Sequence, residues 1–149
     1  MVDIYLTDIK YVSPSVSQKY SKAADYFEVC SAAVKEMRRQ QEKDFFENGL
    51  MKKGMIIRHL VLPGNVSQGM KMLDWVKKNL STDTYISLMG QYMPCAKAYE
   101  YPVINRKISQ REYDIVLSHA EKLGCENVYI QELASSSEEF VPDFDLSGV

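Results

Sequence analysis

The sequence predicts an α/β protein in which parallel strands alternate with helices. Four short segments rich in β-branched and aromatic residues are separated by segments with apolar residues at helical spacing, so the predicted order is β-α-β-α-β-α-β. Strands that alternate with helices form right-handed βαβ units, whose strands are parallel. The chain has 149 residues, of which 46% are hydrophobic, and this suits a single domain with one core.

The first half of the chain contains two predicted strands and one predicted helix. The first strand covers 2–9 (VDIYLTDI), and the second covers 55–62 (MIIRHLVL). The helix runs over 25–41 and begins at a capping box, DYFE. A polar connection over 42–54, with Asn-Gly as a turn signal, leads to the second strand. The residues expected on the inner face of the helix are Val29, Ala32, Ala33 and Met37.

The second half contains two further helices and two further strands. After Pro-Gly, a helix is expected over 65–80, followed by a strand over 83–89 and a long loop over 90–108. The next helix, 109–124, begins at a second capping box, SQRE, and ends at a glycine. The last strand covers 127–132. The residues expected on the inner faces of the two helices are Met70, Leu73, Val76, Leu80, Tyr113, Val116, Leu117 and Ala120.

The predicted fold occupies 1–132, and 133–149 is a polar, acidic tail whose aromatic anchors are Phe140 and Phe144. The first strand starts directly after the first methionine, so no preceding element covers its edge, as if the chain began in the middle of a fold. An uncovered strand edge can pair with another chain, and an edge-paired homodimer is therefore one expected assembly.

Composition excludes several classes of protein. The net charge is −2 and no long basic run occurs, so a nucleic-acid partner is not expected. No segment has the length of apolar sequence that a membrane helix needs, and the N-terminus lacks the features of a signal peptide. The cysteines Cys30, Cys95 and Cys125 are far apart, which predicts free thiols in a reducing cytoplasm and neither a disulfide framework nor a zinc site.

Charged residues lie at or near the carboxyl ends of two predicted strands. In parallel α/β proteins, ligands bind at the carboxyl ends of the strands. Asp8 and Lys10 lie there two positions apart, so they share a face if the strand continues, and they could hold an amino acid by its ammonium and carboxylate groups. Arg58 could point into the same interior and bind a carboxylate or a ribose. The alternatives are an ion pair facing water for Asp8 and Lys10, and a structural salt bridge for Arg58.

Three more residues near these strand ends are candidates with structural alternatives. Gln91 and Tyr92 follow the third strand and could supply an amide and a stacking ring, or could simply pack within the loop. His59 should face a covering helix, where a packing role is favoured over a role as a general base. No dinucleotide-binding or P-loop glycine motif occurs, the two histidines lack metal-ligand spacing, and no catalytic triad or other catalytic residue can be assigned.

Several stretches resemble one known family. DIYLTDIKY, IIRHLVLPG, TYISLMGQYMP and NRKISQREYDIVLSHAEKLG, in this order, are similar to segments of the radical SAM superfamily, in particular the pyruvate formate-lyase activating enzyme-like proteins. The resemblance covers nearly the whole chain. It implies a partial TIM-like barrel with helices on the outer face, of which this chain would be the C-terminal half.

The resemblance also implies a cofactor and a partner. Asp8, Lys10 and Arg58 would line the pocket for S-adenosylmethionine, and Gln91 and Tyr92 would lie nearby, although the family has a histidine near the position of Tyr92. In the family, a 4Fe-4S cluster reduces S-adenosylmethionine to a 5′-deoxyadenosyl radical, which often acts on a glycine of a partner polypeptide.

One departure from the family pattern is large. The Cys-x-x-x-Cys-x-x-Cys motif that holds the cluster is absent, as is the family's glycine-rich segment, so no cluster is expected on this chain and no metal ligand is assigned. The chain alone is expected to be inactive, as a fragment of a longer enzyme. The alternatives are a half-barrel that binds a nucleotide or a partner without redox chemistry, and a structural dimer.

Overall fold

The computed structural model describes residues 2–131 and Leu133. It shows an α/β fold whose main sheet contains strands β1 (Ile4–Asp8), β3 (Leu50–Leu60), β4 (Tyr85–Met89) and β5 (Val128–Ile130) in that order. Each neighbouring pair in this series is parallel, which confirms the predicted sheet. The predicted acidic tail, with Phe140 and Phe144, lies outside the described residues apart from Leu133.

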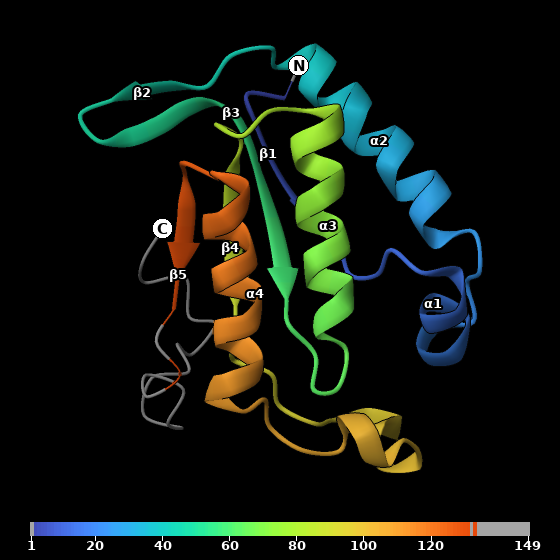
Figure 1. Cartoon of the computed structure of the whole chain (residues 1–149). Coiled ribbons are helices and arrows are strands. Elements are labelled where there is room, and N and C mark those ends of the chain that lie inside the picture. The colour runs from blue at the N-terminus through green and yellow to red at the C-terminus, as the bar shows by residue number, and fades with distance from the viewer. Residues whose placement is uncertain (1, 132, 134–149) are drawn as a thin grey trace.

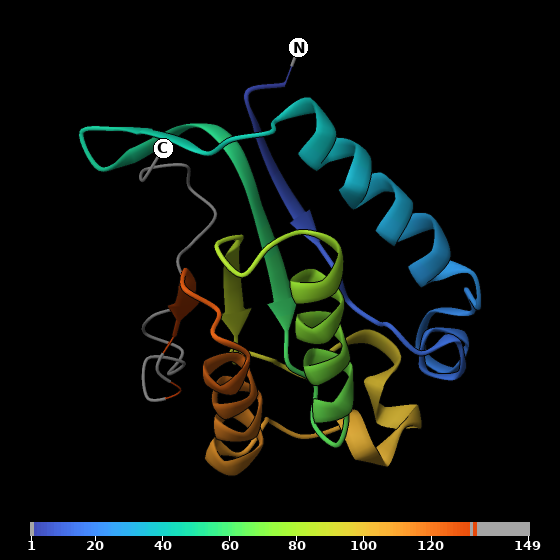
Figure 2. The same ribbon diagram turned by 45° about the horizontal axis from the view of Figure 1, so that its top comes forward.

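Helices α3 (Val66–Asn79) and α4 (Gln110–Leu123) lie side by side on one face of the sheet, and α2 (Tyr26–Gln40) lies beside β1 (Figures 1 and 2). The loop between β4 and α4 contains two short 3-10 helices, η1 (Ala96–Glu100) and η2 (Pro102–Ile104). Within the described part of the chain, no helix combines the length and apolar character needed to cross a membrane.

The core fills the space between the sheet and the helices. Alternate residues of a strand point to opposite faces, and the buried side chains of β3 and β4 that face the helices include Met55, Ile57, Ile86 and Leu88. Side chains of the helices complete this cluster. They include Val34, Met72, Leu73, Val76, Tyr113, Val116 and Ala120.

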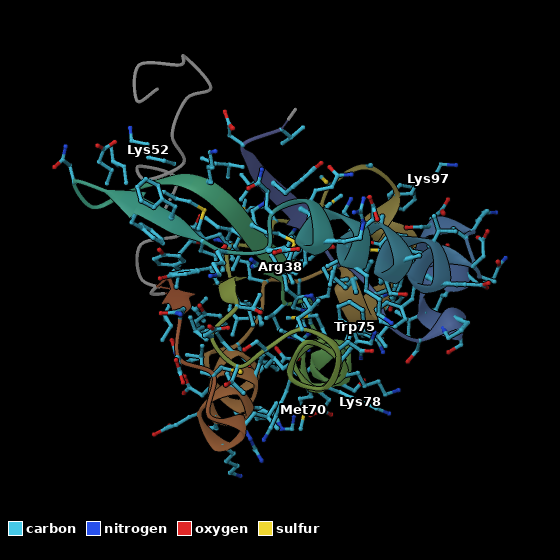
Figure 3. All side chains as sticks on the ribbon, turned by 90° about the horizontal axis from the view of Figure 1, so that it is seen from above. Arg38, Lys52, Met70, Trp75, Lys78 and Lys97 are labelled. Carbon is cyan, nitrogen blue, oxygen red and sulfur yellow. The ribbon has the colours of Figure 1, made fainter. Side chains whose placement is uncertain are left out.

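The segment predicted as a polar connection contains a β-hairpin. Strand β2 (Phe45–Glu47) pairs antiparallel with the beginning of β3, which therefore starts earlier than predicted. The predicted Asn48-Gly49 turn joins the two strands, and both residues have positive φ, 53° and 76°. The hairpin extends away from the helices, with Lys52 on it (Figure 3). Apolar residues on both sides of the turn favour strands over a loop here.

The first half of the chain differs from prediction in three further respects. The capping box predicted at Asp25 does not form, because its side chain makes no capping hydrogen bond to the start of α2. Helix α1 (Pro14–Ser21) was not predicted, because it is short and has weak apolar periodicity, although Pro14 suits its first position. In α2 three of the four predicted inner residues are wrong, since Val29 is 62% exposed and both alanines are exposed, whereas Met37 packs against the core as predicted. The stripe of α2 that faces the core consists of the buried Val34 and the partly buried Phe27, Cys30 and Met37.

Helix α4 forms as predicted. The Ser109 hydroxyl accepts a hydrogen bond from the amide of Glu112, and the Glu112 carboxylate accepts one from the amide of Ser109, so the capping box is complete. Gly124 ends the helix with a left-handed backbone. Leu117 is half-buried against the core and the other three predicted inner residues of this helix are buried.

Candidate functional site

Asp8 and Arg58 form an ion pair at the carboxyl ends of β1 and β3. The two residues are register partners, and Nε of Arg58 donates to Oδ1 of Asp8 at 2.6 Å. The pair lies on the sheet face opposite α3 and α4, because the residues that flank it, Ile57 and His59, point into the core. Both side chains are more than one-third exposed, so a ligand can reach them.

This ion pair belongs to a polar row that crosses the parallel sheet. The register aligns Asp8 with Arg58, Arg58 with Ser87, and Ser87 with Tyr129. All four side chains therefore share the face that α3 and α4 leave uncovered. Sequence reasoning missed Ser87 and Tyr129, because the register of a strand cannot be read from its own sequence.

Lys10 lies at the same end of the sheet, just beyond β1. The amide of Ile9 donates to the carbonyl of Arg58 at 3.0 Å, so the backbone continues along β3 past the last residue of the strand. Lys10 is exposed, and within the described residues its ammonium group has no hydrogen bond or ion pair. An exposed ammonium group at this rim of the sheet can bind a carboxylate.

Side chains of α2 hold the backbone around Lys10. The Tyr26 hydroxyl accepts from the amide of Lys10 at 3.0 Å, and both Tyr26 and the Cys30 thiol donate to the carbonyl of Asp8. Burial raises the pKa of the Tyr26 hydroxyl and of the Cys30 thiol. Cys30 is thus a neutral thiol that supports the strand, and a role as a thiolate nucleophile or ligand is disfavoured.

His59 faces the covering helices, as predicted for a packing residue. It is 2% exposed, and Nδ1 lies 2.7 Å from the carbonyl oxygen of Ile9. A carbonyl only accepts, so Nδ1 carries the proton and donates. Burial lowers the pKa of His59, and Nε2 of the neutral ring, near Gly69 and Val116, has no hydrogen-bond partner in the described part of the chain.

Gln68 is a second buried polar residue that holds the chain after β1. Its side-chain oxygen accepts from the amides of Val12 and Ser13 at 2.9 and 2.8 Å, and its nitrogen donates to the Ser13 hydroxyl. Gln68 is 3% exposed. The helical pattern placed only apolar residues on the inner face of α3, so Gln68 was not predicted.

Gln91 and Tyr92 lie in the loop after β4, where the sequence placed them. Tyr92 donates to the carbonyl of Ile104 at 2.8 Å, and burial raises its pKa, with Tyr11 and Tyr20 close by. This agrees with the loop-packing alternative for Tyr92. Gln91 is half-buried and makes no hydrogen bond to the described residues.

A cluster of tyrosine rings covers the end of β1. The ring centroids of Tyr11 and Tyr26 lie 5.5 Å apart, those of Tyr11 and Tyr20 lie 6.4 Å apart, and Tyr101 contacts Tyr20 edge to face at 5.2 Å. The cluster therefore joins the segment after β1 to the loop after β4, the two segments that carry Lys10 and Tyr92.

Glu112 fixes the Pro63-Gly64 turn after β3. Its carboxylate accepts from the amide of Gly64 at 2.7 Å and from the guanidinium group of Arg106, in addition to its role in the capping box. The Arg106 bond is the main reason why the pKa of Glu112 lies well below its usual range. The loops that follow β3 and β4 are thus held together at the rim.

The described residues do not provide a metal site. They contain no group of three or more histidine, cysteine or acidic side chains that could hold one ion. The thiol of Cys125 also has its pKa raised by burial. Cys30, Cys95 and Cys125 remain free, in accordance with their wide spacing.

A cavity of about 610 Å³ lies at the opposite end of the sheet, near the amino end of β4. Figure 3 views the molecule from this end and labels Arg38, which forms an ion pair with Asp44 beside the cavity. Ligands of parallel α/β proteins bind at the carboxyl ends of strands, so the candidate site is the polar row with Lys10 and not this cavity.

The chain is similar to an uncharacterized protein of the archaeon Methanocaldococcus jannaschii. The two are 33% identical over 132 residues, which make up 87% of this chain and 34% of the relative. The chain therefore spans about a third of the length of that relative. No family model matches the chain, and no solved structure matches it.

Proposed function

We propose that this chain is part of a radical SAM enzyme similar to pyruvate formate-lyase activating enzymes, and that Asp8, Lys10 and Arg58 bind the polar groups of S-adenosylmethionine. The observation that carries the proposal is the ion pair of Asp8 and Arg58 on the uncovered sheet face, with the exposed Lys10, whose side chain has no partner among the described residues, at the same rim. In a longer protein, this sheet would form one part of a partial TIM-like barrel.

The donor set of the site suits an amino acid group. The ion pair uses Nε of Arg58 and Oδ1 of Asp8, so within the described residues Oδ2 and the terminal guanidinium nitrogens remain available. Oδ2 can accept from the ammonium of a bound amino acid, and Lys10 and Arg58 can donate to its carboxylate. S-adenosylmethionine carries both groups and supplies the source of the radical when it is bound.

The cysteines do not fit an iron–sulfur cluster. Such a cluster needs several thiolates close together, whereas these three cysteines are separated by 65 and 30 positions and no metal-ligating group occurs in the described residues. We therefore propose that the cluster of the parent enzyme is held elsewhere, and that this chain alone does not generate the radical. A polypeptide remains the expected substrate class of the parent.

The uncovered sheet face supports the proposal that the chain belongs to a larger unit. Leu6 and Ile4 on β1 and Tyr129 on β5 are between 41% and 56% exposed, and the register places all three on this face. A sheet face with this much exposed apolar surface is typical of one that is covered by other protein. The greater length of the archaeal relative agrees with this interpretation.

Calorimetric titration of S-adenosylmethionine tests the proposed pocket. The wild type should bind, and Arg58→Ala should bind at least about tenfold more weakly, which corresponds to about 1.4 kcal/mol. Arg111→Ala is the matched control, because Arg111 is exposed on α4, on the other side of the sheet. Equal affinities of wild type and Arg58→Ala would show that Arg58 is not part of the site. If the wild type does not bind S-adenosylmethionine, the proposed pocket is wrong.

Iron and sulfide analysis after anaerobic reconstitution tests the second part of the proposal. We expect far less than one cluster per chain, because the chain lacks a set of neighbouring thiolates. A stoichiometric cluster would show that this chain supplies its own ligands, and the assignment as a partner-dependent part of the enzyme would then be wrong.

A partner-binding module without redox chemistry is the second candidate, and the exposed apolar face favours it. Within this alternative, pairing through the edge of β1 would meet an obstacle, since Tyr26, Cys30 and Gln41 all bond to the backbone around this strand. Light scattering at high concentration tests edge pairing: a dimer that persists after Leu6→Lys on the sheet face supports it, and a strict monomer contradicts it.

A further inference from the structure

The chain after β1 is held from the core side by two buried polar residues, although apolar side chains would fill both places. His59 bonds to the carbonyl of Ile9, and Gln68 bonds to the amides of Val12 and Ser13. Both residues belong to elements far from β1 in sequence, the strand β3 and the helix α3. These bonds hold the backbone on both sides of Lys10, at Ile9 before it and at Val12 and Ser13 after it.

His59 retains an unfavourable feature that points to a specific role. Its Nε2 atom is buried without a partner among residues 2–131 and Leu133, and burial of an unpaired polar atom opposes folding. A leucine or phenylalanine in this place would avoid that cost. Of the two ring nitrogens, Nδ1 alone forms a hydrogen bond to the described residues, and a hydrocarbon side chain could not replace this bond to Ile9.

His59 and Arg58 hold β1 from opposite faces of the sheet. The Arg58 carbonyl accepts from the amide of Ile9, and its side chain holds the Asp8 carboxylate on the uncovered face. On the covered face, the next residue, His59, holds the Ile9 carbonyl. These contacts fix the orientation of the peptide group between Ile9 and Lys10. The orientation of this planar group in turn sets the direction in which the side chains of Ile9 and Lys10 leave the backbone.

We propose that His59 and Gln68 are positioning residues that orient Asp8 and Lys10 toward the ligand site without touching the ligand. The inference rests on the proposed function for the identity of the ligand, S-adenosylmethionine, but the positioning itself can be measured without it. Both residues act through the backbone of the segment after β1, and the bond of His59 to Ile9 is the main contact.

The test uses two substitutions at His59 with different hydrogen-bonding capacity. His59→Leu removes the donor, whereas His59→Asn keeps an N–H group near the place of Nδ1. In NMR spectra of the full chain, the Arg58 Nε–H signal reports the bond to Asp8, and the Lys10 amide reports the backbone. We expect His59→Leu to shift the Arg58 signal and to accelerate exchange of both protons at least about fivefold, and His59→Asn to restore most of the wild-type behaviour.

Controls separate positioning from a general loss of stability. Thr84→Val also replaces a buried polar side chain with an apolar one, but at the amino end of β4, and it should leave both signals unchanged. Gln68→Met provides a second variant if His59→Leu fails to fold, and it should accelerate exchange of the Val12 and Ser13 amides and of the Lys10 amide. Unchanged signals in the variants that fold would overturn the proposal, as would equal effects of His59→Leu and His59→Asn.

A binding measurement then connects the positioning to the ligand. We expect the affinity for S-adenosylmethionine to fall at least about fivefold in His59→Leu and to recover in His59→Asn. If the wild type does not bind this ligand while the NMR signals change as expected, the proposed ligand is wrong and the positioning role stands. If the wild type binds and His59→Leu binds equally well, the positioning role is wrong.

Discussion

Arg58 and Asp8 are joined in two ways: they are register partners in neighbouring parallel strands, and their side chains form an ion pair of 2.6 Å. The pair lies on the sheet face opposite α3 and α4, with 39% of the Arg58 side chain and 36% of the Asp8 side chain exposed. Exposed ion pairs contribute little to folding, because water solvates the separated charges well. The pair is therefore expected to add little to the stability of the fold, and this is compatible with the proposed role of both side chains in ligand binding.

We expect Arg58→Ala to lower the free energy of unfolding by no more than about 1 kcal/mol. Arg38→Ala is the comparison, because Arg38 pairs with Asp44 and both of these side chains are less than 20% exposed. Loss of that more buried pair should cost about 2–4 kcal/mol. Urea unfolding of the three proteins measures the difference, and a larger effect at Arg58 than at Arg38 would contradict the assignment of Arg58 to a ligand site.

Glu112 should make the stability of the fold depend on pH in the acid range. Its bond to Arg106, and those to Ser109 and Gly64, hold its pKa below the ordinary value of 4.5. Because the folded state favours the charged form, the stabilisation is complete above the ordinary pKa and is lost as the pH falls below it. The Glu112→Gln variant should therefore be less stable by about 1–3 kcal/mol at neutral pH, with a smaller deficit in acid.

Urea unfolding at several pH values between about 7 and 3 measures this effect of Glu112. Glu121→Gln is the matched control, since Glu121 is exposed on the same helix and its side chain forms no bond to the described residues. That variant should follow the wild type at every pH. A constant deficit of Glu112→Gln over the whole range would show that its charge is not the cause.

Gly69 allows α3 to approach the sheet closely, and alanine in its place should destabilise the protein. A Cβ atom there would lie 3.0 Å from the side chain of Val116 and 3.2 Å from Nε2 of His59. Alanine normally stabilises a helix by about 1 kcal/mol relative to glycine. We expect this gain to be outweighed, so that Gly69→Ala lowers the free energy of unfolding by about 1 kcal/mol.

A double-mutant cycle with Val116→Ala identifies the cause of the Gly69→Ala effect. If contact with Val116 is responsible, Gly69→Ala should be less harmful in the Val116→Ala background, by about 0.5–2 kcal/mol. Additive effects of the two substitutions would place the strain elsewhere. The NMR signals of His59 in the single variant would then show whether the histidine ring had moved.

The order of the fold was predictable because it depends on local patterns, and the candidate site was predictable only in part. Alternating strand and helix signals gave the parallel order, and a capping box and a glycine set the ends of α4. Asp8, Lys10 and Arg58 could be selected because the carboxyl ends of parallel strands meet at one rim. The ion pair between Asp8 and Arg58 depends in addition on the register of β1 and β3, which the sequence of each strand does not set.

Features that depend on register or on a neighbouring element could not be predicted. Ser87 and Tyr129 join the polar row only because each strand is aligned with the next, and a shift by one residue would move both to the other face. The inner face of α2 was mistaken because this helix lies at the edge of the sheet and buries a narrow stripe around Val34. Gln68 of α3 could not be identified because the amides that it binds, those of Val12 and Ser13, lie in the segment after β1, far from α3 in sequence.

Ser87 and Tyr129 lead to a prediction about ligand binding. If the ligand lies over the polar row, Ser87→Ala, next to Arg58, should weaken the binding of S-adenosylmethionine by about threefold to tenfold, as expected for one lost hydrogen bond. Ser118→Ala, on the exposed face of α4, should have no effect. Titration calorimetry measures both, and equal affinity of Ser87→Ala and wild type would place the ligand closer to Lys10.

Tyr113 connects the carboxyl ends of β4 and β5, and its hydroxyl should contribute to stability. The hydroxyl donates to the carbonyl of Leu88 at 2.7 Å and accepts from the amide of Gln131 at 3.1 Å, and the residue is 1% exposed. Tyr113→Phe leaves both backbone groups without this partner, so we expect a loss of about 1–3 kcal/mol in the free energy of unfolding. Tyr99→Phe, at a position that is 69% exposed, should be neutral. Hydrogen exchange adds a local readout: the Gln131 amide should exchange faster in Tyr113→Phe, and an unchanged rate would mean that the end of β5 is held by packing and not by this hydroxyl.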